Sequence, residues 1–275
     1  MPVTSGRRVV VLCDNETSRP DCGCEWGLAL AIDLGEEHGL WLWDTGQTGL
    51  FLDNARALGI DAANARGLAL SHGHYDHTGG LQALLAAGFT GPIYGHAACP
   101  AERYGLSRSK PPKRIGPPAP LPALAPVDDT TELAPGLTLV TNIARQPGRF
   151  EAVQDFSYDP KGRNPDPVPD DAFLVLDGAQ GAVVILGCCH SGLANSLDAA
   201  RSRLGLGPIH AVLGGLHLFQ AGPEPIAETA DALLKHGVRT LVAGHCTGPD
   251  RLAALRPLLP GIEVHALAGG QVWNY

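Results

Sequence analysis

Three histidines and one aspartate lie within six residues of one another in the segment SHGHYDHTGG: His72, His74, Asp76 and His77. The apolar residues 67–70 come directly before this segment and predict a short buried strand. A loop after a strand can direct several side chains to one point, and imidazole nitrogens and carboxylate oxygens are ligands of zinc, iron and manganese. Because these four side chains cannot all face one side of a regular helix, we expect two sets, the first two histidines and the Asp-His pair. The segment therefore predicts two metal ions held side by side.

Each of these ions needs further ligands from elsewhere in the chain. His190 and His245 are the candidates, because each follows an apolar run typical of a strand and has glycines nearby. A lone histidine at a strand end is usually a satisfied polar group, but two of them beside the motif above favour ligation. His217 follows a third such run, and we expect it either to contact a substrate or to be an outer ligand. No role is predicted for the remaining histidines: His38, His96, His210, His236 and His265.

Two metal ions at such a site would support hydrolytic chemistry. Ions about 3.5–4 Å apart can share a water and lower its pKa to roughly 7, which supplies hydroxide at neutral pH. The same ions can polarise a carbonyl or phosphoryl oxygen and stabilise the charge that develops on it. We expect Asp76 to bind metal and also to orient or deprotonate the water, so Asp76 and His217 are the candidate catalytic residues.

The elements that must position these residues follow a repeated pattern. Apolar runs end in Gly, Asp, Cys or His after residues 40–43, 183–186, 209–213 and 240–243. Helical periodicity predicts helices over residues 50–58, 81–87, 226–236 and 251–258. Strands that alternate with amphipathic helices indicate a layered α/β protein. In such proteins the reactive side chains gather at one rim, on the loops at strand ends.

The segment at about residues 101–126 differs from the rest of the chain. It is rich in proline and predicts a long irregular excursion over the surface. Its five cationic residues are Arg103, Arg108, Lys110, Lys113 and Arg114. A basic lid over a metal site could receive a phosphate or carboxylate, and a plain solvated loop is an equal alternative.

The composition excludes several classes of function. With 275 residues the chain can bury a full core, in one large or two small domains. A net charge of −8 argues against a nucleic-acid-binding surface. Apolar runs such as residues 182–186 are far too short to span a bilayer, so we expect no membrane partner.

The start of the chain and its cysteines indicate a cellular compartment. Residues 9–13 are followed by Asp14, which predicts a first strand and not the apolar core of a secretory signal. We therefore expect the seven cysteines to be reduced thiols in a cytoplasmic protein. Cys13 and Cys99 are expected only to pack in the core.

Residues 70–77, LSHGHYDH, resemble the signature of the metallo-β-lactamase superfamily. Five further segments appear in the order of the branch named after 7,8-dihydropterin-6-methyl-4-(β-D-ribofuranosyl)-aminobenzene 5′-phosphate synthase: residues 44–49, 170–175, 187–195, 214–218 and 244–248. The resemblance covers nearly the whole chain from Asp14 onward and is weakest across the proline-rich segment. It implies one domain over residues 1–275, with the α/β fold of a four-layer αββα sandwich and the metal site at the shared edge of two sheets.

The resemblance also implies roles for particular residues. The family's metal positions fall on His72, His74, Asp76, His77, His190 and His245. The segments Glu25-Trp26-Gly27 and Asp170-Asp171 match recurring loop elements of the family, so we expect them near the substrate or around the ligands. Glu25, Asp44 and Asp171 are thus expected either to bind metal or to hold the ligands in place. Cys188 stands where many members have a bridging Asp, so either it is a soft ligand or the bridging carboxylate is absent.

These observations lead to one main functional hypothesis and two alternatives. The main hypothesis is a cytoplasmic enzyme with two divalent metal ions, zinc first and manganese or iron as alternatives. It would catalyse hydrolysis or a related transferase reaction on a small anionic metabolite, phosphorylated or pterin-like. The first alternative is a nuclease, which the acidic net charge disfavours. The second is a metal- or pterin-binding protein without turnover, responsive to redox state through Cys188, Cys189 and Cys246.

Overall fold

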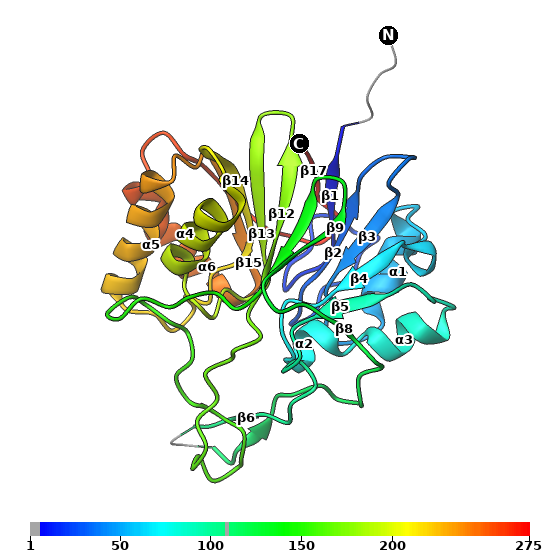
Figure 1. The fold of residues 1–275 in the computed structure, drawn as a ribbon, viewed down its shortest axis with the longest axis horizontal. Helices are drawn as coiled ribbons and strands as arrows, with labels where there is room; N and C mark the ends of the chain where they lie inside the picture. Colours follow the sequence, from blue (N-terminus) through cyan, green and yellow to red (C-terminus); the bar gives the residue numbers. More distant parts are fainter. Residues whose placement is uncertain (1–5, 108–109) are drawn as a thin grey trace.

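The computed structural model describes residues 6–107 and 110–275, in which two seven-stranded sheets face each other (Figure 1). The strand order of the first sheet is β17-β1-β2-β3-β4-β5-β8. Its strands are β1 (Arg8–Cys13), β2 (Ala29–Asp33), β3 (Leu40–Trp43), β4 (Gly67–Ala69), β5 (Ile93–Gly95), β8 (Ala125–Pro126) and β17 (Val272–Asn274).

The second sheet is formed by the later part of the chain, in the order β16-β15-β14-β13-β12-β10-β9. Its strands are β9 (Thr130–Ala134), β10 (Leu137–Val140), β12 (Phe173–Gly178), β13 (Gly181–Leu186), β14 (Ile209–Gly215), β15 (Thr240–Gly244) and β16 (Glu263–Ala266).

Helices cover the outer face of each sheet. The first sheet carries α1 (Leu50–Ala57) and α3 (Leu81–Ala86), and the second carries α4 (Leu193–Leu204), α5 (Pro223–Lys235) and α6 (Pro249–Leu255) (Figure 1). The short helix α2 (Tyr75–Thr78) lies within the histidine motif, and 3₁₀ turns form at η1 (Ala62–Asn64), η2 (His245–Thr247) and η3 (Arg256–Leu258). The predicted four-layer αββα sandwich is therefore confirmed.

The alternation of side chains along the strands explains this layering. In β1, Val9 and Val11 pack between the two sheets, whereas Val10 and Leu12 pack on the opposite face among residues of α1 and α3. Buried residues of both sheets, among them Trp43 and Ile185, form the central core. Each sheet is thus buried on both faces, as its nearly continuous apolar strands require.

Parallel pairing brings the functional loops to one edge. Strands β3, β4 and β5 pair in parallel in the first sheet, and β13, β14, β15 and β16 pair in parallel in the second. Carboxyl ends of parallel strands meet at the same edge of a sheet, and ligands in open α/β sheets bind there. The predicted site segments follow β3, β4, β13, β14 and β15 at these ends.

Helix α4 was not predicted, although its sequence carries a signal. Leu193, Leu197, Ala200 and Leu204 have the i, i+4, i+7, i+11 spacing of an apolar helical stripe, and the first three are buried. The glycines and cysteines directly before this segment are typical of a loop, and they mask the start of the helix in the sequence. In the part of the chain that the structure describes, no helix is long and apolar enough to cross a membrane.

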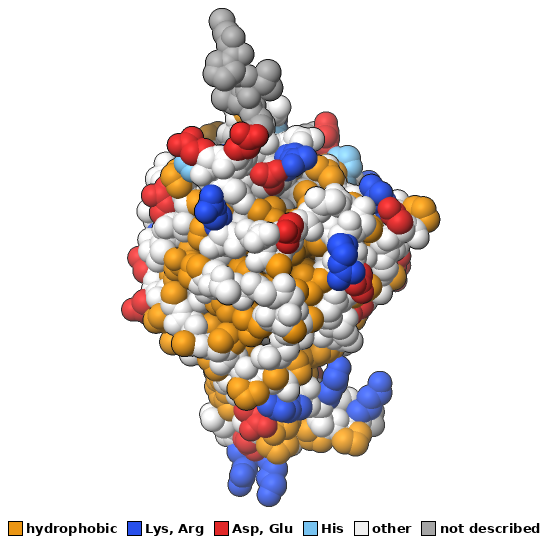
Figure 2. All heavy atoms as spheres, turned by 90° about the vertical axis from the view of Figure 1, so that its right-hand side faces the viewer, with side chains coloured by type: hydrophobic (Ala, Val, Ile, Leu, Met, Phe, Trp, Pro, Cys, Tyr) orange, Lys and Arg blue, Asp and Glu red, His pale blue; other side chains and the backbone are white. Residues whose placement is uncertain are grey.

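The proline-rich segment is more ordered than predicted. It contains β6 (Tyr104–Gly105) and β7 (Lys113–Arg114), which form a small third sheet with β11 (Phe156–Ser157). This sheet lies below the sandwich in Figure 1, and Figure 2 shows Lys and Arg side chains gathered at the lower end of the molecule. Arg108 lies outside the described residues.

Candidate metal centre

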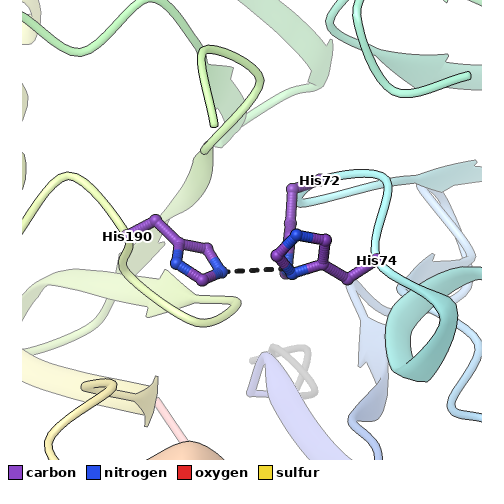
Figure 3. Close-up of side chains that lie close together, drawn as sticks. All are labelled: His72, His74 and His190. Carbon is purple, nitrogen blue, oxygen red and sulfur yellow. Dashed lines mark hydrogen bonds between the residues drawn. The ribbon is translucent and has the colours of Figure 1, made fainter. Parts of the chain in front are cut away.

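Three imidazoles meet where the two sheets share an edge (Figure 3). His72 and His74 come from the loop after β4, and His190 comes from the loop after β13. His72 Nε2 lies 3.0 Å from His74 Nδ1 and 3.3 Å from His190 Nε2. The three donor atoms lie within 4.8 Å of one another, and we call these residues the first donor group.

A second cluster lies directly beside the first. His77 Nε2 is 3.1 Å from His245 Nε2, which in turn is 3.6 Å from Asp76 Oδ2. These three residues, also within 4.8 Å of one another, are the second donor group. The structure thus brings His190 to the first pair of the motif and His245 to the second pair.

Hydrogen bonds fix the remote nitrogen of most of these rings. His190 Nδ1 lies 2.6 Å from the Ala152 carbonyl oxygen, and His245 Nδ1 lies 3.2 Å from Asn15 Oδ1. His77 Nδ1 lies 2.7 Å from Asp44 Oδ2. Since all three partners are acceptors, each Nδ1 carries a proton, and the Nε2 atoms of His190 and His245 then present lone pairs.

Ser71 fixes His72 in the same way. The Ser71 hydroxyl donates to Asp44 Oδ2 at 2.7 Å, so its oxygen accepts from His72 Nδ1 at 2.8 Å. The Nε2 lone pair of His72 then faces that of His190. Facing lone pairs at 3.3 Å repel each other unless a cation lies between them. In addition, His74 Nε2 is buried and has no hydrogen-bond partner. This donor set fits divalent transition metals.

The charge states of the rings agree with this assignment. Burial lowers the pKa values of four of them well below the ordinary histidine value: His72, His74, His190 and His245. Burial acts in the same direction on His77, but the Asp44 carboxylate outweighs it and raises the pKa of His77 to about 9. Four of the five imidazoles are therefore neutral near pH 7, as metal ligation requires, whereas His77 without a metal is protonated and would release its Nε2 proton on binding one.

Cys188 lies between the two donor groups. Its Sγ is 3.1 Å from His77 Nε2 and belongs to three sets of mutually close donors, with His72 and His77, with His190 and His217, and with His245 and Cys246. Burial raises the pKa of the Cys188 thiol well above its ordinary value. A cation beside it would favour the thiolate, so Cys188 can serve as a shared soft donor.

His217 lies against the first donor group. Its ring centroid is 4.4 Å from that of His190, and its buried Nδ1 has no hydrogen-bond partner. It also lines a cavity of about 500 Å³ together with Phe156 and Phe219. This position suits the expected contact with a substrate as well as an outer ligand.

Several of these residues have strained backbones. Asp44, Cys189, His217 and His245 have φ between 48° and 61°, a region that non-glycine residues seldom adopt. All four directly follow or closely follow a strand at the shared edge. Such strain typically accumulates at functional sites, where the surrounding structure maintains it.

Glu25 and Asp171 support loops and do not lie among the donors. Glu25 Oε1 accepts hydrogen bonds from the Gln47 and Thr48 amides, both at 2.9 Å, which fixes the turn after β3. Asp171 Oδ2 accepts from the Ser191 amide at 2.7 Å, next to His190. Among the described residues, neither carboxylate belongs to a set of mutually close donors.

Arg103 fits neither alternative for the proline-rich segment, a basic lid or a plain solvated loop. Its side chain is fully buried and forms ion pairs with Asp170 at 2.7 Å and Asp166 at 3.2 Å. The second oxygen of Asp170 accepts from the Gly73 amide at 2.7 Å, between the two histidines of the first donor group. Arg103 is therefore unavailable to a substrate phosphate and instead holds the histidine loop in place.

Sequence reasoning did not identify Arg103, Asn15, Ser71 or Ala152 as supports of the site. Asn15 also donates from Nδ2 to the His245 carbonyl at 3.0 Å, a contact across 230 residues of chain. Its position two residues after the first strand was the one local signal. Ala152 contributes only its carbonyl oxygen, which no side-chain pattern can indicate.

Comparisons with known proteins agree with this geometry. The family model of the metallo-beta-lactamase superfamily matches residues 21–201. The chain is 28% identical over 221 residues to 7,8-dihydropterin-6-methyl-4-(beta-D-ribofuranosyl)-aminobenzene-5′-phosphate synthase of Methanocaldococcus jannaschii, covering 72% of this chain and 71% of that protein. It is 25% identical over 262 residues to protein MJ0448 of the same organism, covering 91% and 94% of the two chains.

A solved structure extends the match to the whole fold. The crystal structure of Tm1679, a metal-dependent hydrolase of the beta-lactamase superfamily, has a TM-score of 0.82 and 26% identity to this chain. The match covers 98% of this chain and 99% of that one. Because the family model, the αββα sandwich and the histidine motif all agree, the chain belongs to the metallo-beta-lactamase superfamily.

Proposed function

We propose that this protein is a metal-dependent enzyme that holds two divalent ions, zinc first and manganese or iron as alternatives. It catalyses hydrolysis or a related group transfer on a small anionic metabolite, phosphorylated or pterin-like. The first ion is bound by His72, His74 and His190, and the second by Asp76, His77 and His245, with Cys188 between them.

One observation carries this proposal. In the first donor group, the Nε2 lone pairs of His72 and His190, fixed by hydrogen bonds at the remote ring nitrogens, point at each other over 3.3 Å. Buried lone pairs that face each other are unfavourable without a cation, whereas the same arrangement is what a metal-ligating histidine cluster needs. An ordinary buried histidine would place a donor against an acceptor instead.

When bound, a pair of divalent ions would acidify a water and polarise an oxygen of the substrate. Asp76 is suited to orient that water and receive its proton, because Trp26 Nε1 donates to its Oδ2 at 2.9 Å and fixes the carboxylate. In hydrolysis the water oxygen bonds to the electrophilic centre, the bond to the leaving group breaks, and the leaving group takes up a proton. His217, with its unpartnered Nδ1, would contact the substrate from the side of the first donor group.

Two features support an anionic, small-molecule substrate. Lys113 donates to the Tyr75 hydroxyl at 2.9 Å and lies over its ring, so a cation lies against α2, the helix that also carries Asp76 and His77. The similarity to a synthase of a phosphorylated pterin compound points to the same substrate chemistry.

All seven cysteines are free, which suits a reducing compartment, and we propose that the enzyme is cytoplasmic.

The test is turnover measured on a panel of phosphate esters and pterin phosphates, with the parent protein and with His74→Ala. His38→Ala is the matched control, because His38 lies in the turn before β3, at the opposite end of that strand from Asp44. We expect His74→Ala to lose turnover while its circular dichroism spectrum stays unchanged. We expect His38→Ala to keep both its turnover and its spectrum. Unchanged turnover in His74→Ala would contradict the proposal. A parent protein that binds metal but turns over none of these substrates would favour the alternative, a metal-binding protein without turnover.

A further inference from the structure

A cavity of about 450 Å³ opens beside the second donor group. It is bordered by His245, and its floor is formed at the carboxyl ends of β1, β15 and β16 by Asp14, Gly244 and Leu267. We call it the Trp26 cavity, after the ring that separates it from Asp76. Its volume is typical of pockets that bind small molecules.

Two exposed aromatic side chains wall this cavity. Trp26 and Phe219 are 41% and 39% exposed, and their ring centroids lie 6.0 Å apart at 73°. The Trp26 ring is held by its hydrogen bond to Asp76 and lies 5.5 Å from the ring of His245. Exposed aromatic faces at fixed angles favour a flat ring as the occupant, because such a ring can stack on one and meet the edge of the other.

The floor of the cavity carries an unpartnered carboxyl group. Asp14 is 1% exposed, its Oδ2 accepts from the Glu16 amide at 3.4 Å, and its Oδ1 has no hydrogen-bond partner. A Cβ on Gly244 would come within 3.2 Å of Oδ1, so the glycine keeps the space before this oxygen open. A buried carboxyl oxygen without a donor is unfavourable, and a ligand N–H would satisfy it.

A cationic group complements this acceptor. Arg251, on the first turn of α6, lines the same cavity, and its buried Nε has no hydrogen-bond partner. An occupant with N–H donors on one part of its edge and a carbonyl oxygen on another would therefore satisfy both Asp14 and Arg251. The aminopyrimidinone ring of a pterin is a flat ring of this kind.

We propose that the Trp26 cavity binds the aminopyrimidinone ring of a pterin-class substrate, with Asp14 Oδ1 accepting from its N–H groups. The ring lies against Trp26 and Phe219, and its substituent reaches past His245 toward the two donor groups. This inference rests on the proposed function for the direction of the substituent, and it assigns specificity to Asp14, Arg251 and the two aromatic walls.

The test uses the intrinsic fluorescence of 6-methylpterin to measure binding to the metal-loaded protein and to the chelator-treated protein. The comparison ligand is the matching pteridine-2,4-dione, in which an oxygen replaces the amino group. We expect the pterin to bind at least about tenfold more tightly than the dione, since only the pterin offers the amino donor to Asp14.

The matched variants are Asp14→Asn and Asp250→Asn, the second at an exposed position on the rim of the same cavity. We expect Asp14→Asn to weaken pterin binding by about tenfold or more and Asp250→Asn to leave it within about twofold. If Asp14→Asn does not fold, Phe219→Ala replaces it, with an expected weakening of about two- to tenfold.

Equal binding of the two ligands, or undiminished pterin binding in folded Asp14→Asn and in Phe219→Ala, would overturn the assignment. Metal content, measured in parallel, distinguishes failure of the cavity assignment from failure of the proposed function. A protein that holds its metals but does not bind pterin contradicts only the cavity assignment. Protein without metals whose pterin binding still depends on Asp14 contradicts only the metal-dependent function.

Discussion

The two donor groups lie side by side but differ in chemistry and in support. The first consists of three imidazoles, and its loop is held by a buried Arg103–Asp170 ion pair that reaches the Gly73 amide. The second combines a carboxylate with two imidazoles, and His245 is fixed there by Asn15. The first group is therefore neutral and rigidly framed, whereas the second carries charge and borders the Trp26 cavity. On the proposed function, we expect the first group mainly to anchor its ion and the second to lie nearer the ring of the substrate.

Arg103→Met has the largest expected effect and acts on the first group. Removing the guanidinium leaves Asp166 and Asp170 buried without a counter-charge, which should lower the free energy of unfolding by about 3–5 kcal/mol. Urea unfolding measures this change. The control is Arg114→Met, which removes an exposed ion pair with Glu102 and should cost less than about 1 kcal/mol. Equal losses for the two variants would show that the buried pair does not frame the site.

Gly187→Ala acts on both groups at once. A Cβ at this position would lie 2.2 Å from Ser71 Oγ, the hydroxyl that joins Asp44 to His72, so the two sheets must move apart locally. We expect a loss of about 1–3 kcal/mol in stability and weaker binding of both ions. The thermal midpoint and the metal content are the readouts.

Gly207→Ala is the matched control for this overpacking, because a Cβ at Gly207 meets no atom within 4 Å. This variant should change the free energy of unfolding by less than about 0.5 kcal/mol relative to the parent protein. If Gly187→Ala weakened only one ion, the idea of a junction shared by both groups would fail.

Asn15→Ala acts on the second group and has the smallest expected effect. Without the Asn15 oxygen, His245 loses the acceptor that fixes its Nδ1 proton, so affinity for the second ion should fall about tenfold. Competition with a metal-sensitive chelator dye measures both affinities. Asn64→Ala, which removes a contact with Asp61 on the surface, should change neither. An equal fall for both ions would remove the distinction between the groups.

The first donor group was more readily predicted than its supports. His72 and His74 stand in one contiguous motif after a strand, so local sequence was enough to indicate them. His190 and His245 could be predicted as partners because each follows a strand whose carboxyl end reaches the same edge. In contrast, Arg103 contacts Asp170 across 67 residues, and nothing in its own segment distinguishes it from a surface cation.

The charged residues of the flanking loops were the least predictable. Glu25 was expected to bind metal or to lie near the substrate or around the ligands; its carboxylate accepts hydrogen bonds from amides of the turn after β3. A carboxylate that fixes a turn cannot be distinguished in sequence from one that contacts a substrate. The partner of the first is a backbone amide and that of the second is a ligand, and neither is visible as a side-chain pattern. The fold class, which depends on strand and helix periodicity and on the family motif, was correspondingly easier to predict than these contacts.

The most direct test of the account is metal content per chain, measured by elemental mass spectrometry on protein purified without added metal. The parent protein is compared with His190→Ala, which removes a ligand of the first group, and His245→Ala, which removes one of the second. We predict about two ions in the parent and about one in each variant. One ion or none in the parent, or two ions kept by either variant, would contradict the account of two separate donor groups.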